Sequence, residues 1–485
     1  MVKYDLAKTS VIEVVDDILA YAATHNVSDI HFDPREDSLV VRTRIDGDLI
    51  DYTEIPKIYE RNLITRIKLL SNMNITESRL PQDGSIKGTI KGIAMETRVS
   101  TLPTNEGEKC VIRILDYTMS FEGIDSLGFH PQNLEKLKKM MMEPNGIILI
   151  TGATGSGKST TVYSILQALN KKETNIITVE DPIEMNIEGL NQVQVNSEIG
   201  LDFATVLRSI LRQDPNIILI GEIRDSETAK IAVRASITGH LVLSTIHTNN
   251  SLSTIERLLD MNVERYLLSS ALSGIISQKL AKKLCPHCRK LEKTTPYEKK
   301  VFQLVLDKEV DEIYVANKDG CEQCNGGYHG RIAIQEVLMI DDIIRNALND
   351  ERVKKEDLNK IVYTKDVITM LQDALYKVLD GITSFEEVYR IIDIDDDLNS
   401  QPLLLEKQEI ISKESIHNDS ESINLESKNH NKTKEIIENL ELNSNDNTSN
   451  ENKVSPDINT ISTLTSSDTT INNSLPSIMS IANNQ

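Results

Sequence analysis

The stretch Gly146-Ile-Ile-Leu-Ile-Thr-Gly152-Ala-Thr-Gly-Ser-Gly157-Lys158-Ser159 decides the fold. A short apolar run predicts a buried strand, and glycines followed by Lys-Ser lead from it into a helical pattern. Glycines allow backbone N–H groups to surround phosphates at a helix start, while Lys158 meets the β- and γ-phosphates and Ser159 holds Mg²⁺. A fortuitous glycine-rich turn is the alternative, and the strand and helix context argues against it. The predicted nucleotide contacts are Gly152, Ala153, Thr154, Gly155, Ser156, Gly157, Lys158, Ser159 and Thr160.

Apolar runs and helical segments alternate from residue 131 to residue 282. The runs are Ile147–Ile150, Ile176–Val179, Ile217–Ile220 and Leu241–Ser244. Continuous apolar runs are typical of parallel strands that helices cover on both faces. We therefore expect an α/β nucleotide-binding core. Residues 283–330 predict an irregular cysteine-bearing subdomain, and residues 331–395 a C-terminal helical part with helices at Val367–Val378 and Ser384–Ile391.

Residues 1–116 predict a small α/β domain ahead of this core. A helical pattern at Val11–Thr24 precedes strand-like runs at Asp29–Phe32, Leu39–Ile45, Ala94–Ser100 and Cys110–Leu115. The apolar pattern loosens over residues 117–130, where we place a linker. A predicted helix at Gln132–Met142 then opens the second domain.

Carboxylates follow two of the predicted core strands. Glu222 comes after Ile217–Ile220, and Glu180 to Glu184 follow Ile176–Val179. Ligands of open α/β sheets bind at the carboxyl ends of the strands, so these groups belong beside the phosphate loop. Glu222 is the first candidate for the group that activates the attacking water, and Glu180 or Glu184 is a candidate for reaching Mg²⁺. Exposed strand ends are the alternative for each acid taken alone.

Two histidines, His240 and His247, flank the run Leu241–Ile246. This layout suits a γ-phosphate sensor that couples nucleotide state to movement. A structural hydrogen-bonding role is the alternative for either histidine.

Four of the five cysteines occur in Cys-x-x-Cys pairs. These are Cys285 with Cys288 and Cys321 with Cys324. Four thiolates from two tight turns match a closed tetrahedral Zn²⁺ site, which predicts a structural metal. Free thiols or redox pairs are the competing interpretations.

The formal net charge of −21 gives no support to a duplex-coating protein. No run approaches the roughly 18 apolar residues of a membrane helix, so we expect a cytosolic chain. Residues 396–485 are rich in Asn, Ser and Thr, and residues 401–485 carry six Lys against thirteen Asp and Glu. Such a composition predicts a disordered acidic tail, with a weakly helical patch at Lys432–Leu442.

The motifs together resemble the type II secretion and type IV pilus assembly ATPase family. The phosphate loop, Thr178–Glu184, Gly221–Asp225 and Thr238–Thr248 stand in the order of that family's Walker A, Asp box, Walker B and His box. Ser28–Pro34, Arg42–Gly47 and Arg79–Gly84 are similar to its second N-terminal domain. The resemblance extends to about Asp395 and implies a PAS-like N-terminal domain, a RecA-like P-loop core with an inserted zinc subdomain, and ATP as substrate.

The resemblance further implies a homo-hexamer at the inner face of the cell membrane, peripherally attached through an inner-membrane platform protein. The acidic charge balance leads us to expect no direct nucleic-acid contact. Arg98 and Arg113 match N-terminal arginines that approach the phosphates, and Arg208 and Arg212 match arginines of the core. Surface salt bridges are the alternative for these arginines. The tetracysteine element is common in assembly and secretion members and typically absent from retraction members.

Three features depart from the family pattern. Ala153 replaces a usual Pro and Asn250 replaces a common Asp, and neither change removes a phosphate or metal ligand. The chain is expected to begin at the second N-terminal domain, without the additional domain that many assembly ATPases use to dock on their membrane complex. The expected function is assembly of a pilus or secretion pseudopilus. The alternatives are a retraction or competence motor, a nucleotide-sensing scaffold with little hydrolysis, and a nucleic-acid translocase.

Overall fold

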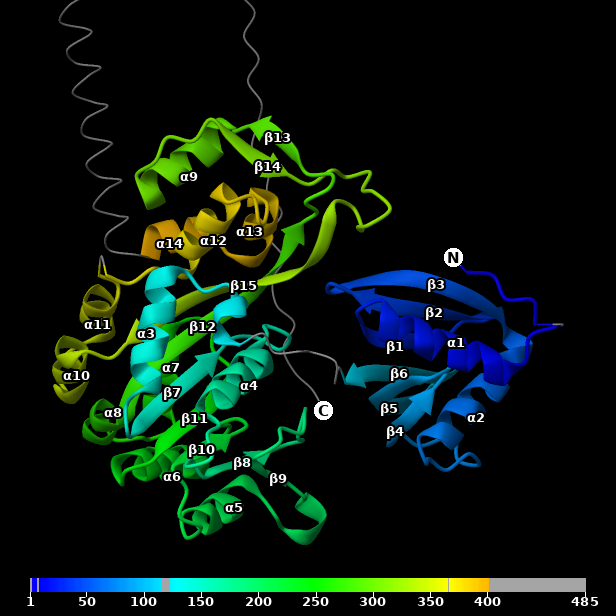
Figure 1. The fold of residues 1–485 in the computed structure, drawn as a ribbon, viewed down its shortest axis with the longest axis horizontal. Coiled ribbons are helices and arrows are strands. Elements are labelled where there is room, and N and C mark those ends of the chain that lie inside the picture. The colour runs from blue at the N-terminus through cyan, green and yellow to red at the C-terminus, as the bar shows by residue number, and fades with distance from the viewer. Residues whose placement is uncertain (1, 7, 116–122, 365, 401–485) are drawn as a thin grey trace, which may run out of the picture. The chain divides into compact units, whose positions relative to one another are not determined.

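The computed structural model describes residues 2–6, 8–115, 123–364 and 366–400. Its N-terminal domain contains a six-stranded antiparallel sheet in the order β3-β2-β1-β6-β5-β4 (Figure 1). The strands are β1 (Val27–Pro34), β2 (Ser38–Ile45), β3 (Asp48–Pro56), β4 (Gln82–Ile90), β5 (Ile93–Thr104) and β6 (Gly107–Leu115). Strands β1, β2, β5 and β6 confirm the four predicted runs, whereas β3 and β4 were not predicted.

Helices α1 (Val11–Thr24) and α2 (Glu60–Leu70) pack against this sheet. Ser10 begins α1 through a capping box: its hydroxyl accepts from the Glu13 N–H, and the Glu13 carboxylate accepts from the Ser10 N–H. Ile18 of α1 and Phe32 of β1 are both fully buried in the resulting core. The predicted helix is confirmed at both of its ends.

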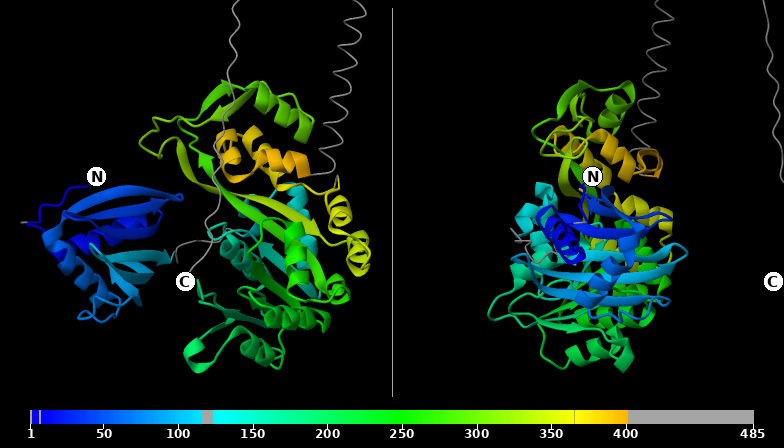
Figure 2. Two further views of the ribbon diagram at one scale, coloured as in Figure 1. Left: turned by 180° about the vertical axis from the view of Figure 1, so that it is seen from behind. Right: turned by 90° about the vertical axis from the view of Figure 1, so that its right-hand side faces the viewer.

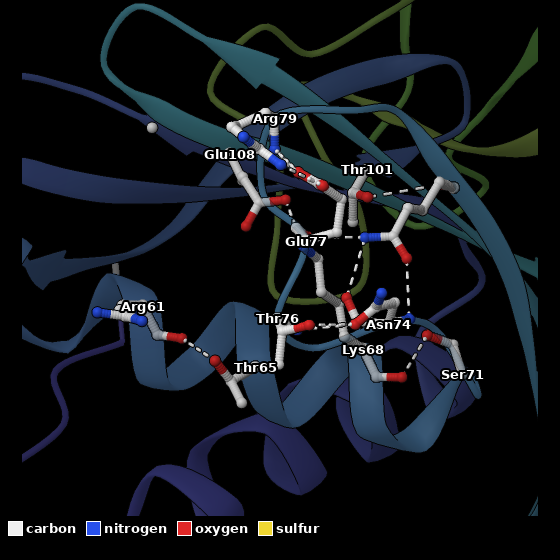
Figure 3. A network of polar contacts seen from close by, with 12 residues as sticks. Arg61, Thr65, Lys68, Ser71, Asn74, Thr76, Glu77, Arg79, Thr101 and Glu108 are labelled. Carbon is white, nitrogen blue, oxygen red and sulfur yellow. Dashed lines mark hydrogen bonds and ion pairs between the residues drawn. The ribbon is translucent and has the colours of Figure 1, made fainter.

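A buried lysine fastens the connection between α2 and β4 (Figure 3). Lys68 is 1% exposed, and its ammonium donates to the Glu77 carbonyl at 2.6 Å and to the Glu108 carboxylate. The Gln82 amide donates to the carbonyls of Asn74 at 3.0 Å and Glu77 at 2.9 Å. These contacts tie the irregular segment 71–81 to α2 and β4, and Lys68 also joins α2 to β6.

The second domain is built on a seven-stranded sheet in the order β15-β12-β7-β11-β10-β8-β9. Its strands are β7 (Gly146–Thr151), β8 (Ile176–Glu180), β9 (Asn191–Gln194), β10 (Ile217–Ile220), β11 (Leu241–Ile246), β12 (Leu272–Leu284) and β15 (Tyr328–Met339). Neighbouring strands are parallel except for β12 and β15, which are antiparallel. The four predicted core strands are confirmed as β7, β8, β10 and β11.

Helices cover both faces of this sheet. Alternate residues of β7 belong to different cores: Ile148 packs with α3 (Pro131–Met141) and α4 (Lys158–Leu169), and Leu149 packs on the opposite face. That opposite face is covered by α5 (Phe203–Ile210), α6 (Ser226–Ile237), α7 (Ser251–Asp260), α8 (Arg265–Ala271), α10 (Asp342–Asn349) and α11 (Lys355–Val362). Burial on both faces explains why the strand has a continuous apolar run.

Strands β12 and β15 extend beyond the other core strands (Figure 2). A third core joins them to β14 (Glu312–Val315), α9 (Pro296–Leu306), α12 (Met370–Leu379), α13 (Phe385–Ile391) and α14 (Ile394–Ser400), and β13 (Lys290–Lys293) pairs with β14. The expectation of irregular structure in residues 283–330 was wrong, because this segment contains α9 and the β13–β14 pair. Residues 331–339 are strand rather than helix.

The start of the acidic tail also differs from the prediction. Residues 394–400 form α14, and Leu398 is 7% exposed, so residues 396–400 are helical where disorder was expected. The remaining tail, including the patch at Lys432–Leu442, lies outside the described residues, as does segment 117–122 of the predicted linker.

Candidate functional site

The phosphate-binding loop connects β7 to α4 as the sequence predicts. Gly152 has a φ of 151°, and a Cβ there would lie 2.4 Å from the carbonyl oxygen of Gln278. Gly157 has a φ of 86°, in the left-handed region that favours glycine. From β12, the Gln278 amide donates to the Ser156 carbonyl at 2.7 Å and accepts from the Thr161 hydroxyl at 2.9 Å. Glycines and Gln278 together determine the shape of the loop.

Lys158 begins α4 at the end of this loop. Its ammonium donates to the carbonyl oxygens of Gly152 at 2.8 Å and Ala153 at 3.0 Å. Burial lowers the pKa of Lys158, and the Glu222 carboxylate acts in the opposite direction. Both hydrogen-bond acceptors are neutral, so the positive charge of Lys158 is available to an anion.

The loop borders a cavity of about 450 Å³, within the usual size range of ligand pockets. The predicted site residues that line it are Arg113, Thr154, Gly155, Gly157, Lys158, Ser159, Thr160, Glu180, Glu184, Glu222 and His247. Gly152, Ala153 and Ser156 belong to the loop without lining the cavity. The structure therefore brings together the loop, both strand-end carboxylates and one of the two histidines.

Glu222 lies just beyond the carboxyl end of β10. Its Oε1 accepts from the Arg224 guanidinium, and its Oε2 lies 3.6 Å from Nε2 of His247. The Glu222 side chain is 17% exposed, whereas that of His247 is 51% exposed. Two side chains that carry or can acquire positive charge thus restrain a carboxylate beside the phosphate loop.

Glu180, the last residue of β8, is 4% exposed and has different partners. Its Oε2 accepts from the Tyr163 hydroxyl at 2.5 Å. Its Oε1 accepts from the Thr178 hydroxyl at 2.6 Å and the Gln192 amide at 3.1 Å. All three donors are neutral, so their hydrogen bonds stabilise the carboxylate without forming an ion pair.

His240 lies away from this cavity. It precedes β11 whereas His247 follows it, so about six residues of strand, roughly 20 Å, separate them. His240 Nδ1 is 2.8 Å from the Ala235 carbonyl at the end of α6, and His240 is not among the cavity-lining residues. The structure therefore does not bring His240 together with the phosphate loop, and its contacts match the structural alternative.

The core arginines also form local contacts outside the cavity. Arg208 pairs with Glu227 of α6. Arg212 donates to the Arg208 carbonyl at 2.7 Å and to the Ser209 hydroxyl at 3.2 Å. Neither guanidinium lines the cavity, so the structure does not bring Arg208 and Arg212 together with the phosphate loop.

The two N-terminal arginines stand directly opposite each other, Arg98 on β5 and Arg113 on β6. Arg113 donates to the Asp29 carboxylate at 2.9 Å. Arg98 does not line the cavity, and its Nη2 is buried without a hydrogen-bond partner among the described residues. Of this pair, Arg113 is the one that contributes to the cavity wall.

Sequence reasoning missed three side chains that organise the site: Tyr163, Arg224 and Gln278. Arg224 stands two residues after Glu222, so the sequence could have indicated that its positive charge pairs with this carboxylate. Tyr163 and Gln278 contact the site through tertiary structure, and their neighbours in the sequence carry no signal of it.

The four paired cysteines meet beyond the end of β12. Their sulfur atoms all lie within 4.8 Å of one another. Cys285 and Cys321 are 3.7 Å apart, and Cys288 and Cys324 are 3.6 Å apart. Tetrahedral zinc–thiolate bonds of about 2.3 Å place sulfurs roughly 3.8 Å apart, so this donor set fits such an ion. The cluster confirms that the two Cys-x-x-Cys pairs converge.

Comparisons with known proteins agree with these motifs. The family model described as "Type II/IV secretion system protein" matches residues 5–390. The chain belongs to this family. "Type II secretion system protein E" of Dickeya dadantii is 44% identical over 388 residues, which cover 79% of this chain and 75% of that relative. "Type IV pilus assembly ATPase PilB" of Thermus thermophilus is 44% identical over 385 residues, covering 79% of this chain and 43% of that protein.

Among solved structures, that of the pilus retraction motor PilT with bound ADP has a TM-score of 0.53 and 26% identity, covering 78% of this chain and 96% of that one. This member of the type II/IV secretion family is thus an ATP-hydrolysing enzyme. Among the residues that the structure describes, no helix combines the length and apolarity needed to cross a membrane.

Proposed function

We propose that this ATPase uses hydrolysis of ATP to drive assembly of a type IV pilus or a type II secretion pseudopilus. The observation that carries the proposal is the single cavity that unites Lys158 and Ser159 with Glu180 and Glu222. The names of its secretion and pilus relatives support the filament assignment. We further propose that it works as a hexamer at the cytoplasmic face of the inner membrane, together with a platform protein.

Lys158, Ser159 and Glu180 have proposed roles in binding ATP and Mg²⁺. Lys158 contacts the β- and γ-phosphate oxygens, because its ammonium lies at the loop and carries no carboxylate hydrogen bond there. The Ser159 hydroxyl and the Glu180 carboxylate are hard oxygen donors that suit Mg²⁺ and its waters, and the ion supplies charge neutralisation at the phosphates.

Glu222 is proposed to orient and deprotonate the attacking water. Its position beyond β10 places a carboxylate at the same sheet edge as the phosphate loop. The Arg224 guanidinium donates to Oε1 of Glu222, and Nε2 of His247 lies 3.6 Å from Oε2, so these two side chains flank the carboxylate. His247 also stands where a change at the γ-phosphate would reach β11, in keeping with the sensor role.

The cysteine cluster is proposed to bind a structural zinc ion through Cys285, Cys288, Cys321 and Cys324. Four thiolate ligands close the tetrahedral coordination shell and leave no position for substrate. In the family that the sequence resembles, this element accompanies assembly and secretion, so it favours an extension motor over a retraction motor.

The test is steady-state ATPase activity of Glu222→Gln and Lys158→Ala, with mass measured by light scattering with and without ATP. We expect Glu222→Gln to bind ATP and assemble near six subunits, while turnover falls about a hundredfold, as for loss of a general base. Lys158→Ala should lose turnover. The exposed Glu173→Gln is the matched control, with unchanged turnover. Wild-type turnover in Glu222→Gln would reassign the base to Glu180.

A further inference from the structure

Tyr163 connects α4, the helix that follows the phosphate loop, to the acidic segment 180–184. It is on α4, five residues after Lys158, and is 4% exposed. Its hydroxyl donates to Glu180 Oε2 at 2.5 Å and accepts from the backbone N–H of Glu184 at 3.1 Å. One oxygen atom therefore fastens both ends of this acidic segment to α4.

The direction of these hydrogen bonds is fixed by chemistry. A phenol has a single proton to donate, and the Glu184 N–H is a donor, so the tyrosine proton lies toward the Glu180 carboxylate. Burial and the adjacent Glu180 charge raise the pKa of Tyr163, so the hydroxyl keeps its proton across the physiological range.

The other donors to Glu180 come from the sheet. Thr178 belongs to β8, the strand of Glu180 itself, and Gln192 belongs to the neighbouring β9. Both donate to Oε1, whereas Tyr163 donates to Oε2. The Tyr163 contact thus connects the carboxylate to the helix that also carries Ser159.

We propose that Tyr163 is a positioning residue for ATP hydrolysis. By fixing Oε2 of Glu180 relative to α4, its hydroxyl keeps the position of the Glu180 carboxylate constant relative to Ser159, which is on the same helix. The inference rests on the proposed role of Glu180 at Mg²⁺. It assigns the Tyr163 hydroxyl to the chemical step rather than to ATP affinity, since Lys158 and the loop glycines make the direct phosphate contacts.

Tyr163→Phe separates this role from packing. The ring belongs to the apolar core between the sheet and helices α3 and α4, and phenylalanine keeps that ring while removing the hydroxyl. We expect kcat to fall about tenfold, the lower end for loss of an outer hydrogen-bond partner, with KM for ATP changed less than about twofold. Tyr266→Phe, at an exposed tyrosine of α8, is the matched control and should keep wild-type kcat.

A double-mutant cycle with Glu180→Gln decides whether the hydroxyl acts through Glu180. If it does, Tyr163→Phe lowers kcat in the wild type and causes no further loss beside Glu180→Gln. Wild-type kcat in Tyr163→Phe, or an equal loss in both backgrounds, overturns the inference while leaving the role of Glu180 intact. Wild-type kcat in Glu180→Gln overturns that role itself. Loss of fluorescent ATP-analogue binding in Tyr163→Phe would also refute the inference, since the hydroxyl would then support the loop.

Discussion

Replacing Lys68 with methionine should loosen the N-terminal domain. The Lys68 side chain is 2% exposed and that of its partner Glu108 is 16% exposed, so the ion pair is largely removed from water. Methionine keeps most of the aliphatic volume of lysine. The variant therefore tests the ammonium, which also donates to the Glu77 carbonyl, rather than the packing of the chain.

The expected loss of stability follows from the Glu108 carboxylate that the substitution leaves buried without its partner. Removing one partner of a buried ion pair costs about 3–5 kcal/mol, because the other charge stays buried without compensation. Glu108 keeps some contact with water, so we expect the lower end, about 3 kcal/mol. Lys68→Met combined with Glu108→Leu removes both charges and should recover to within about 1 kcal/mol of the wild type.

Hydrogen exchange measured by mass spectrometry on the full chain reports this change locally. A loss of about 3 kcal/mol corresponds to roughly hundredfold faster exchange in peptides from β4 and β6. Lys87→Met is the matched control, since Lys87 pairs with Glu96 at the surface of the same domain and is 71% exposed. That change should cost less than about 1 kcal/mol. Equal exchange in Lys68→Met and the wild type would refute the reasoning.

Two further predictions concern the second domain. Cys288→Ser should abolish zinc binding by the purified protein, as measured by elemental analysis. Cys110→Ala, outside the cluster, is the control and should retain zinc. Retained zinc in Cys288→Ser would contradict the tetrahedral assignment. Burial, reinforced by the Glu336 carboxylate, raises the pKa of Asp397 from 3.8 to about 7. The folded state thus binds a proton more tightly than the unfolded state, so this stabilisation is present below pH 3.8 and is lost as pH rises toward 7. Denaturant unfolding at pH 5 and pH 8 should show a smaller loss of stability in Asp397→Asn than in the wild type, and equal losses would exclude this carboxyl as the source.

The core strands were predictable because they are buried on both faces. Strand β7 has all six residues buried, and its sequence is a continuous apolar run. Strands β12 and β15 were not predicted, and residues 331–339 of β15 were expected to be helical. Each leaves the core sheet and becomes partly exposed, so charged residues such as Lys282 and Arg331 interrupt the apolar pattern at that point.

Site residues were predictable from the sequence where each one follows a recognisable strand. Lys158 and Glu222 are placed by the strand that precedes each of them. His240 was expected at the site, but it lies at the opposite end of β11 from His247, and only the His247 end borders the cavity. Gln278 was missed because its contact with Ser156 spans 122 positions, a distance over which local pattern carries no information.

Strand β12 joins the cysteine cluster to the phosphate loop. Its pairing with β7 ends at Ser277, and beyond this point the described part of the strand pairs with β15 alone, as far as Leu284. A two-stranded ribbon is marginally stable by itself, so its far end needs other support. That support comes from the third core and from the cluster that begins at Cys285, whose N–H donates to the Gly327 carbonyl at 2.8 Å. Fraying after loss of a metal would start at this end and reach Gln278 last, so nucleotide binding should outlast the order of the subdomain.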